Sequence, residues 1–204
     1  MIEDREQNIV IPLYSAGVDE VGRGALAGPV VAGAVIFDPE IHIQGLKDSK
    51  KCTAEERESL ADEIWRSALA CGIGMATASE IDDMNILNAS HVAMQRAVES
   101  LSPAPKKVYV DGRLLPDFEV PAVAIIRGDQ RVREISAGSI IAKVERDRMM
   151  EELDLLFPDF GWKRNKGYPT KEHLNALKIA GPVSYHRMTF RPVRENMIHL
   201  GNKS

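Results

Sequence analysis

Two short apolar runs near the start of the chain, separated by a glycine-rich turn, most constrain how it can fold. Residues 13–20 (LYSAGVDE) and 29–37 (PVVAGAVIF) are rich in Val, Ile and Ala and are bounded by glycines. Runs of this length and composition are typical of β-strands, and they are too short to cross a bilayer. We predict two strands of a hairpin-like pair here. Similar runs at 71–79, 107–112 and 120–127 predict three further strands.

Helical spacing of apolar residues separates these predicted strands. Thr53 and Glu56 have the spacing of a capping box, so a helix is expected to begin at Thr53. Its apolar positions at helical spacing are Leu60, Ile64 and Leu69. Asp82 or Asp83 is expected to cap the next helix, which runs to about residue 100.

Two more helices are predicted in the second half of the chain. Residues 130–157 form a long stretch with helical apolar spacing that Pro158 ends, and Gly138 within it indicates close packing. A last helix is expected over 170–180, capped by Thr170. Because strands come first and then alternate with helices, the sequence predicts an α/β fold whose mixed sheet is covered by helices on both faces.

Length and composition indicate one ordinary globular domain. The 204 residues are 44% hydrophobic and 27% charged. We expect a single domain over 13–197 with tails at 1–12 and 198–204. The acidic N-terminus is unlike a signal peptide, and Cys52 and Cys71 form neither a metal motif nor a disulfide framework. A cytoplasmic protein that is not associated with a membrane is therefore predicted.

Charge is unevenly distributed along the chain. The formal net charge is −4, but residues 160–204 carry +7 and residues 1–159 carry −11. An acidic body with a basic C-terminal quarter suits a polyanion held at one face while carboxylates act elsewhere. A solvated basic surface would give the same count.

Four acids stand at or just beyond the ends of predicted strands, and these are Asp19, Glu20, Asp111 and Asp129. Ligands of α/β sheets bind beyond the strand ends. Clustered carboxylates without matching His or Cys residues favour a hard cation, Mg²⁺ or Mn²⁺. Two such ions can activate a water and stabilise the leaving oxygen in phosphodiester cleavage.

Three of these positions leave alternatives open. Adjacent residues of a regular strand point to opposite faces, so Asp19 and Glu20 can share a site only if the strand bends at Glu20. Asp129 could instead cap the helix that follows it. Asp147 is an alternative fourth carboxylate, although its arginine neighbours favour ion pairs on a helix surface.

Two further segments could contact a nucleic acid. The Gly22-Arg23-Gly24 turn does not open a helix, which excludes a Rossmann or P-loop site, but its backbone can approach a ligand and Arg23 can pair with phosphate. A bulge or tight turn between strands is the alternative. Tyr168 lies in a basic loop and could stack on a sugar or base, or simply anchor that loop. His173, on the last helix, is expected to be structural.

Six segments of the chain, taken in their order along the sequence, resemble the ribonuclease HII (type 2 ribonuclease H) family. The resemblance runs over residues 13–193, and the ordered set is far more specific than a lone DE or GRG. Its segments are AGVDEVGRGALAGPVVAGAVIF (16–37), LKDSKK (46–51), YVDG (109–112), RGDQRVREISAGSIIAKVERDRMM (127–150), NKGYPTKEH (165–173) and HRMTFRPV (186–193). Departures from the family pattern fall at Ala25, Gly138 and Asn165, none of them a catalytic position.

This resemblance implies a ribonuclease H-like fold followed by C-terminal helices. It also implies an endonuclease that hydrolyses the RNA strand of RNA/DNA hybrids and incises 5′ of ribonucleotides embedded in duplex DNA. The products would carry 3′-hydroxyl and 5′-phosphate ends, and the cellular role would be ribonucleotide excision repair. The implied cofactor is Mg²⁺ or Mn²⁺, with two ions during catalysis. The implied partner is nucleic acid, bound by a monomer.

The resemblance further assigns roles to two sets of residues. The metal-binding catalytic carboxylates would be Asp19, Glu20, Asp111 and Asp129. The substrate-binding set would be Gly22, Arg23 and Gly24, reading the 2′-hydroxyl through the backbone, Tyr168, stacking near the ribose at the RNA–DNA junction, and Lys50 and Lys143, contacting phosphates. The 2′-hydroxyl is the group that distinguishes RNA from DNA, so these roles agree with the reading of the residues themselves.

Two other functions fit parts of the same pattern. A four-carboxylate exonuclease on a related fold would use similar acids but would need a free substrate end. A non-catalytic hybrid-binding module would bind the duplex with the usual salt dependence and leave it intact. Such a module has no need to place four acids against a phosphate backbone.

Overall fold

The computed structural model describes residues 11–46 and 52–201, and its centre is a five-stranded mixed sheet. The strands lie in the order β3-β2-β1-β4-β5. Their bounds are Ser15–Val21 (β1), Val30–Ile36 (β2), Ala70–Ala76 (β3), Lys107–Asp111 (β4) and Ala122–Ile125 (β5). β1, β2 and β3 pair antiparallel, whereas β4 runs parallel to both β1 and β5. The predicted hairpin-like pair and the α/β fold with a mixed sheet are confirmed.

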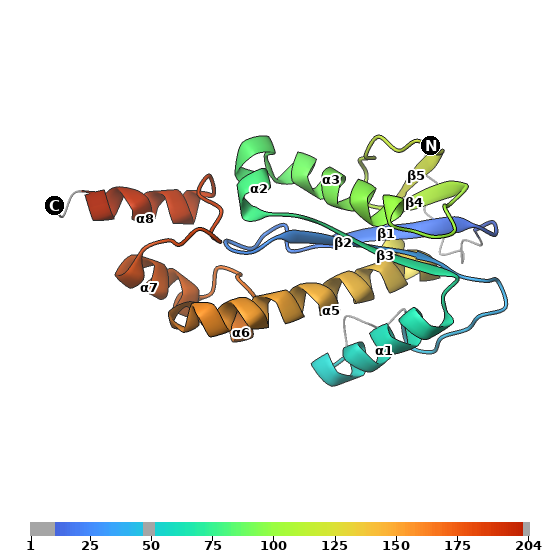
Figure 1. Ribbon diagram of the computed structural model, residues 1–204, viewed down its shortest axis with the longest axis horizontal. Helices are drawn as coiled ribbons and strands as arrows, with labels where there is room; N and C mark the ends of the chain where they lie inside the picture. Colours follow the sequence, from blue (N-terminus) through green and yellow to red (C-terminus); the bar gives the residue numbers. More distant parts are fainter. Residues whose placement is uncertain (1–10, 47–51, 202–204) are drawn as a thin grey trace.

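Helices cover both faces of this sheet (Figure 1). Their bounds are Ala54–Ser67 (α1), Ala78–Met84 (α2), Ile86–Glu99 (α3), Gly128–Arg131 (α4), Arg133–Leu156 (α5), Trp162–Asn165 (α6), Lys171–Ala180 (α7) and Arg191–Gly201 (α8), with a 3-10 turn at Pro158–Phe160. One apolar core lies between the sheet and α3, and a second lies between the sheet, α5 and α1. A third joins the end of α5 to α6, α7 and α8, which form the predicted C-terminal helical part.

Glycines allow α5 to lie directly on β1 and β2. A Cβ placed on Gly17 would lie 2.2 Å from the main-chain nitrogen of Ile135, and one on Gly33 would lie 2.3 Å from the carbonyl oxygen of Gly138. Gly138 itself meets the Gly33 carbonyl in the same way. The close packing predicted at Gly138 is therefore confirmed. This contact fixes the height of α5 over the sheet, and with it the position of every side chain that α5 presents along β1.

Two predicted helix starts are confirmed in atomic detail. The Thr53 side chain accepts from the Glu56 N–H at 3.2 Å, while the Glu56 carboxylate accepts from the Thr53 N–H at 2.8 Å. Thr170 accepts from the N–H of His173 at 3.2 Å and caps α7. The apolar face of α1 was predicted less well, since the helix ends before Leu69, which is exposed.

The prediction that Asp82 or Asp83 caps one helix reaching residue 100 is wrong. The structure has two helices there, α2 capped by Thr77 and α3 capped by Asn85. Thr77 and Glu80 form a second capping box, with Glu80 N–H donating to Thr77 Oγ1 at 3.2 Å. Asp82 lies inside α2, where its carboxylate accepts main-chain N–H groups from the segment before α8.

The long helix predicted over 130–157 is also divided. Val132 adopts extended backbone angles and separates the single turn of α4 from α5. Asp129 lies in the first turn of α4, and the N-cap positions are occupied by Arg127 for α4 and Val132 for α5, so the alternative that Asp129 is the cap of the following helix is wrong. The division turns α4 toward the end of β4.

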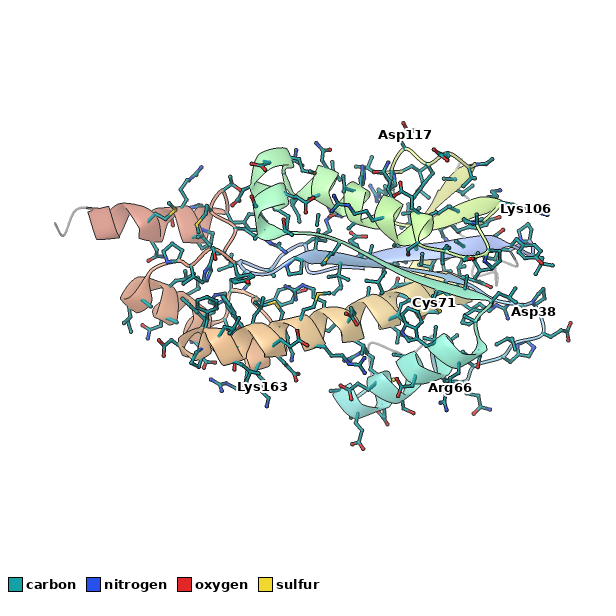
Figure 2. The ribbon with its side chains drawn as sticks, viewed as in Figure 1. Asp38, Arg66, Cys71, Lys106, Asp117 and Lys163 are labelled. Atoms are coloured by element: carbon teal, nitrogen blue, oxygen red, sulfur yellow. The ribbon has the colours of Figure 1, made fainter. Side chains whose placement is uncertain are left out.

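The structure bears only in part on the predictions about membrane association and domain bounds. No helix within residues 11–46 and 52–201 is long and apolar enough to cross a membrane. Figure 2 shows side chains filling the space between the sheet and its helices, with Cys71 on the β3 side that faces α1. The division into a domain over 13–197 with short tails stays a prediction, and most of the first tail lies outside the described residues.

Candidate active site

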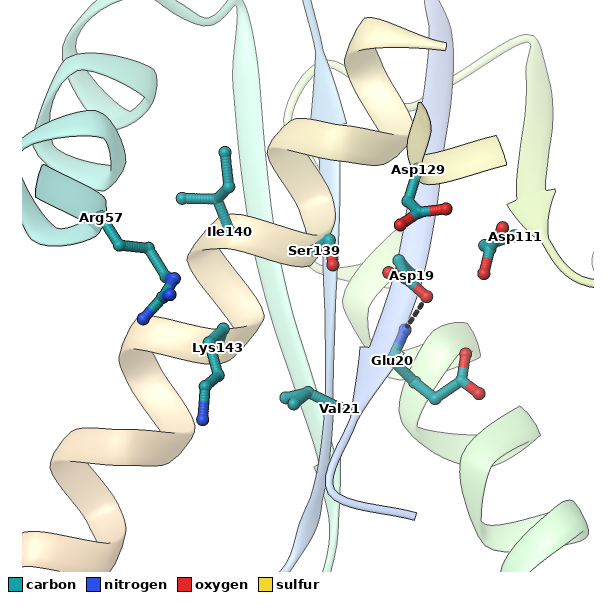
Figure 3. Close-up of a pocket in the computed structure, with 9 residues that line it drawn as sticks. All are labelled: Asp19, Glu20, Val21, Arg57, Asp111, Asp129, Ser139, Ile140 and Lys143. Atoms are coloured by element: carbon teal, nitrogen blue, oxygen red, sulfur yellow. Dashed lines mark hydrogen bonds between the residues drawn. The ribbon is translucent and has the colours of Figure 1, made fainter. Parts of the chain in front are cut away.

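A pocket of about 430 Å³ opens where the parallel strands β1 and β4 end, beside α5 (Figure 3). Its lining residues are Asp19, Glu20, Val21, Arg57, Asp111, Asp129, Ser139, Ile140 and Lys143. All four acids predicted as catalytic carboxylates line it. Asp147 does not, so Asp129 is the fourth acid of this pocket.

Three of the acids lie on the α5 side of the sheet. Asp19 follows Gly17 by two residues on β1 and so shares the face that α5 covers. Asp111 ends β4, and its carboxylate accepts from the Gly128 N–H at 2.6 Å, which ties β4 to the start of α4. Asp19 and Asp129 are 7% and 9% exposed. Figure 3 shows the three carboxylates of Asp19, Asp111 and Asp129 gathered at one end of the pocket.

Glu20 reaches the pocket without the bend predicted for β1. The pairing of β1 with β2 continues unbroken through Glu20 and Val21, so the Glu20 side chain leaves on the α3 side. However, β4 pairs with β1 only as far as Val18. The edge of β1 beside Glu20 is therefore open to the pocket. Its carboxylate also lines a second hollow under α3 and forms an ion pair with Arg23 at 2.9 Å.

The carboxylates disfavour one another's charge. Burial raises the pKa of Asp19 well above its usual value, and the neighbouring carboxylates of Glu20 and Asp111 raise it further. Hydrogen bonds from the Ser139 hydroxyl and the Glu20 N–H oppose this rise. A divalent cation at this end of the pocket would balance the accumulated negative charge.

The donor set fits such a cation in chemistry. Its ligands are all carboxylate oxygens, which suit Mg²⁺ or Mn²⁺ rather than zinc. Within residues 11–46 and 52–201, no group of three or more His, Cys, Asp or Glu side chains could hold a metal ion as the side chains stand. One oxygen of Glu20, a candidate ligand, is engaged in the ion pair with Arg23.

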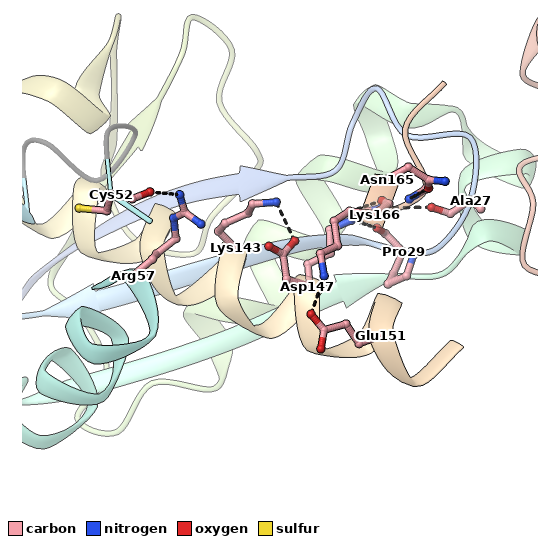
Figure 4. Close-up of polar contacts among 11 residues, drawn as sticks. Ala27, Pro29, Cys52, Arg57, Lys143, Asp147, Glu151, Asn165 and Lys166 are labelled. Carbon is pink, nitrogen blue, oxygen red and sulfur yellow. Dashed lines mark hydrogen bonds and ion pairs between the residues drawn. The ribbon is translucent and has the colours of Figure 1, made fainter. Parts of the chain in front are cut away.

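Basic residues form the opposite wall. Lys143, on α5, pairs with Asp147 at 2.6 Å, and Arg57, on α1, donates to the Cys52 carbonyl at 2.9 Å (Figure 4). The prediction that Asp147 makes an ion pair on a helix surface is confirmed, although its partner is Lys143 rather than a neighbouring arginine. Lys50, the other predicted phosphate contact, lies outside the described residues.

The glycine turn and Tyr168 lie against each other. A Cβ on Gly24 would lie 3.9 Å from a ring carbon of Tyr168. Gly22 has a φ of 93°, a conformation that favours glycine, and its carbonyl accepts from the Ala25 N–H. The Arg23 carbonyl points inward to the guanidinium of Arg187. Because C=O and the following N–H point in opposite directions across a trans peptide, the N–H groups of Arg23 and Gly24 point outward.

Comparison with known proteins identifies the family of this chain. A profile of the ribonuclease HII family matches residues 16–193. The chain belongs to the ribonuclease HII family. It is 54% identical over 180 residues to a ribonuclease HII of Shewanella amazonensis, covering 88% of this chain and 87% of that one. The chain therefore has the activity of this family, which is that of a metal-dependent endoribonuclease.

Solved structures of similar proteins support the fold. The ribonuclease H2 of Pyrococcus horikoshii superposes with a TM-score of 0.77 at 30% identity, covering 92% of this chain and 98% of that one. A Bst ribonuclease HIII solved in complex with Mn²⁺ superposes at 0.70 with 18% identity, covering 92% and 70%, and this likeness concerns the fold alone. The predicted ribonuclease H-like fold with C-terminal helices is confirmed.

Two arginines of this ribonuclease HII were missed as site residues. Arg146 and Arg187 are fully buried, and their guanidinium groups hold the turn that follows β1. Their main-chain acceptors are the carbonyls of Arg23, Ala27, Gly28, Pro29 and Lys166. Burial, helped by the charge of the neighbouring Arg146, lowers the pKa of Arg187 to about 9. Helical spacing could have found Arg146, since Ala142 and Met150, four residues to either side, are both buried.

Two polar lining residues, Ser139 and Arg57, were also missed. Ser139 lies four residues before Lys143, on the same face of α5, so the prediction of Lys143 already implied it. Arg57 lies on α1, a helix on which no site residue was predicted. Only the packing of α1 against α5 brings Arg57 to the pocket.

Proposed function

We propose that this pocket hydrolyses the RNA strand of RNA/DNA hybrids and incises 5′ of ribonucleotides embedded in duplex DNA, leaving 3′-hydroxyl and 5′-phosphate ends. Such incision would start ribonucleotide excision repair. One observation carries the proposal. Four carboxylates line a pocket that is linked, through the ion pair of Glu20 with Arg23, to a glycine turn with outward N–H groups.

The proposed roles follow the positions of the side chains. Asp19, Glu20, Asp111 and Asp129 would hold Mg²⁺ or Mn²⁺, with two ions during catalysis. When bound, these ions would lower the pKa of a water and balance charge on the phosphate. Asp111 also has a structural role, because its Oδ1 accepts a hydrogen bond from the Gly128 N–H at the start of α4.

Recognition of the ribonucleotide is assigned to the neighbouring surface. The N–H groups of the Gly22-Arg23-Gly24 turn would donate to the 2′-hydroxyl, since a backbone donor without a bulky side chain can approach the sugar closely. Tyr168, half-buried beside Gly24, would stack near the ribose at the RNA–DNA junction. Lys143 and Lys50 would contact phosphates. The basic C-terminal quarter would add long-range attraction to the duplex.

We further propose that the protein works in the cytoplasm as a monomer. Burial raises the pKa of the Cys71 thiol to about 12, so Cys71 stays protonated and unreactive, as suits a reducing compartment. Sedimentation equilibrium at several concentrations tests the oligomeric state. A mass near twice that of the 22.5 kDa chain would contradict the monomer.

The test of the function uses a DNA duplex with one internal ribonucleotide and both ends blocked. With Mg²⁺ or Mn²⁺ we expect a single nick 5′ of the ribonucleotide, and none with a chelator or on the all-DNA duplex. A requirement for a free end would favour the exonuclease. Binding without cleavage by folded, metal-supplied protein would favour the hybrid-binding module. If hybrids are cut but the embedded ribonucleotide is not, the roles of the glycine turn and Tyr168 are wrong.

Two matched variants test the carboxylates. Asp111→Asn keeps an oxygen to accept from the Gly128 N–H, so the fold should survive while cleavage is abolished. Asp147→Asn removes an acid from the same region that does not line the pocket, and cleavage should persist. Near-wild-type cleavage by Asp111→Asn would remove Asp111 from the catalytic set.

A further inference from the structure

Two histidines form a buried chain of hydrogen bonds behind the Tyr168 loop. His173 and His186 are 0% and 1% exposed, and their Nε2 atoms lie 3.0 Å apart. The indole N–H of Trp162 donates to His173 Nε2 at 3.1 Å, and the N–H of Val183 donates to His186 Nδ1 at 3.0 Å. At the other end, His173 Nδ1 lies 3.0 Å from the carbonyl oxygen of Tyr168.

These partners fix where each proton lies. The Val183 N–H can only donate, so His186 Nδ1 accepts and its proton is on Nε2. The Trp162 indole likewise makes His173 Nε2 an acceptor, which places the His173 proton on Nδ1. The His173 Nδ1–H group then donates a hydrogen bond to the Tyr168 carbonyl oxygen. Both rings are neutral, and the chain runs in one direction from Val183 to Tyr168.

The chain has little freedom to move. The His186 ring lies 4.7 Å from the centroid of Phe160 and 5.2 Å from that of Trp162, and the His173 ring contacts the same two aromatics. His173 is further held by the cap of α7, where its own N–H donates to Thr170. A donor fixed this rigidly sets the position of its acceptor.

The acceptor at the end of this chain belongs to Tyr168, whose ring is proposed to stack near the ribose. The Tyr168 carbonyl also accepts from the Thr170 N–H at 2.8 Å, and the Tyr168 N–H donates to the Asn165 carbonyl at 2.9 Å. The backbone of Tyr168 is thus held on both sides, while its ring lies free of the core between the Arg146 guanidinium, 5.5 Å away, and Gly24.

We propose that His173 is a positioning residue for Tyr168, and that the directed chain from Val183 through His186 holds the Tyr168 ring at the height of the glycine turn. This inference rests on the proposed role of Tyr168 in reading the ribonucleotide. His173 does not touch the substrate. It acts through one hydrogen bond, from Nδ1 to the Tyr168 carbonyl.

A pair of substitutions isolates that hydrogen bond. The amide of Asn occupies the place of Nδ1, so His173→Asn keeps a donor for Tyr168 and loses the contacts of Nε2. His173→Gln does the reverse. Both remove a buried ring, and both should lower the melting temperature. The readout is the ratio of kcat on the embedded-ribonucleotide duplex to kcat on the long hybrid. We expect His173→Gln to lower this ratio by on the order of tenfold or more, because the Tyr168 ring is misplaced. His173→Asn should keep the wild-type ratio. Equal ratios for the two variants would overturn the proposal.

A double-mutant cycle separates positioning from general damage. If His173 acts through Tyr168, His173→Gln should have no further effect on the ratio in a Tyr168→Ala background. A full additional effect there would refute the inference. Amide hydrogen exchange of residues 166–170 in the free protein gives a readout without substrate. Exchange should rise in His173→Gln and not in His173→Asn.

The two failures can be told apart. If Tyr168→Ala leaves the ratio of the two substrates unchanged, the proposed role of Tyr168 is wrong, whatever His173 does. If Tyr168→Ala lowers the ratio but hydrogen exchange is equal in both His173 variants, the positioning is wrong and the function stands.

Discussion

The buried histidine pair makes a quantitative prediction about stability and pH. Burial, together with the neighbouring His173, lowers the pKa of His186 from 6.5 to about 4 in the folded protein. Between these two values the unfolded chain binds a proton that the folded chain does not, so stability falls as the pH decreases. At about pH 4.5 the His186 ring alone should lower the free energy of unfolding by about 2.5 kcal/mol relative to about pH 7.5.

The assay is urea unfolding of the wild type and of His186→Asn at those two pH values. The Asn oxygen can still accept from the Val183 N–H, so the variant keeps one end of the chain but has no ring to titrate. The wild type should lose about 2.5 kcal/mol more than the variant on acidification. Carboxylates cancel in this comparison because both chains contain them. For example, the pKa of Glu80 is lowered to about 2 in either chain, chiefly by its hydrogen bond with Arg96.

Equal losses in the two chains would refute the reasoning. They would mean that His186 is protonated in the folded protein at about pH 4.5, and hence that the directed chain of neutral rings is not the native arrangement. His173 remains in both chains. Its pKa is also lowered by burial, so it adds a slope of the same sign to both.

Two other substitutions test the packing of α5 and the charges on it. Gly17→Ala would place a Cβ 2.2 Å from the Ile135 nitrogen, a main-chain atom that cannot turn aside. The substitution should lower the free energy of unfolding by about 3 kcal/mol or more. If the variant unfolds at the wild-type urea midpoint, this close contact is wrong. Lys143→Gln removes the proposed phosphate contact and leaves Asp147 without its partner, so binding of catalytically inactive protein to the duplex should weaken and the slope of log K against log salt should become shallower by about one. An unchanged slope would exclude Lys143 as a phosphate contact.

Local signals in the sequence predicted the elements whose ends are set locally. Thr53 and Thr170 cap helices by bonds to residues three positions away, and both starts are confirmed. The pair formed by β1 and β2 was also predictable, because a glycine turn joins two apolar runs. The cap at Thr77 shows that a local signal can still be overlooked. Its capping box was equally local, but the neighbouring pair of aspartates was the more conspicuous cap candidate.

Elements whose ends are set by distant contacts were predicted less well. Nothing in the periodicity of residues 130–157 requires a break at Val132. The hydrogen bond from the Gly128 N–H to Asp111, seventeen residues earlier, holds α4 in a different direction from α5. The same bond makes Asp129 a wall of the pocket rather than a cap.

The site shows the same division between local and distant causes. The four acids could be predicted because each lies at or just beyond the end of a predicted strand, and strand ends meet at one edge of a sheet. The arrangement of Glu20 could not, since it depends on how far β4 extends along β1. Lys143 and Arg57 reach the same pocket from two helices that pack against each other, a contact that neither helix encodes alone.

The buried arginines explain why the glycine turn has its shape. A fully buried guanidinium is costly unless its N–H groups are satisfied, and here main-chain carbonyls of the turn supply the acceptors for both Arg146 and Arg187. The Arg23 carbonyl is drawn inward to Arg187, which turns the Gly24 N–H of the same peptide outward. The buried charge of Arg187 thus helps to keep this donor of the turn directed at the surface. Neither arginine could be replaced by lysine without loss, because one ammonium group cannot reach acceptors spread along the turn.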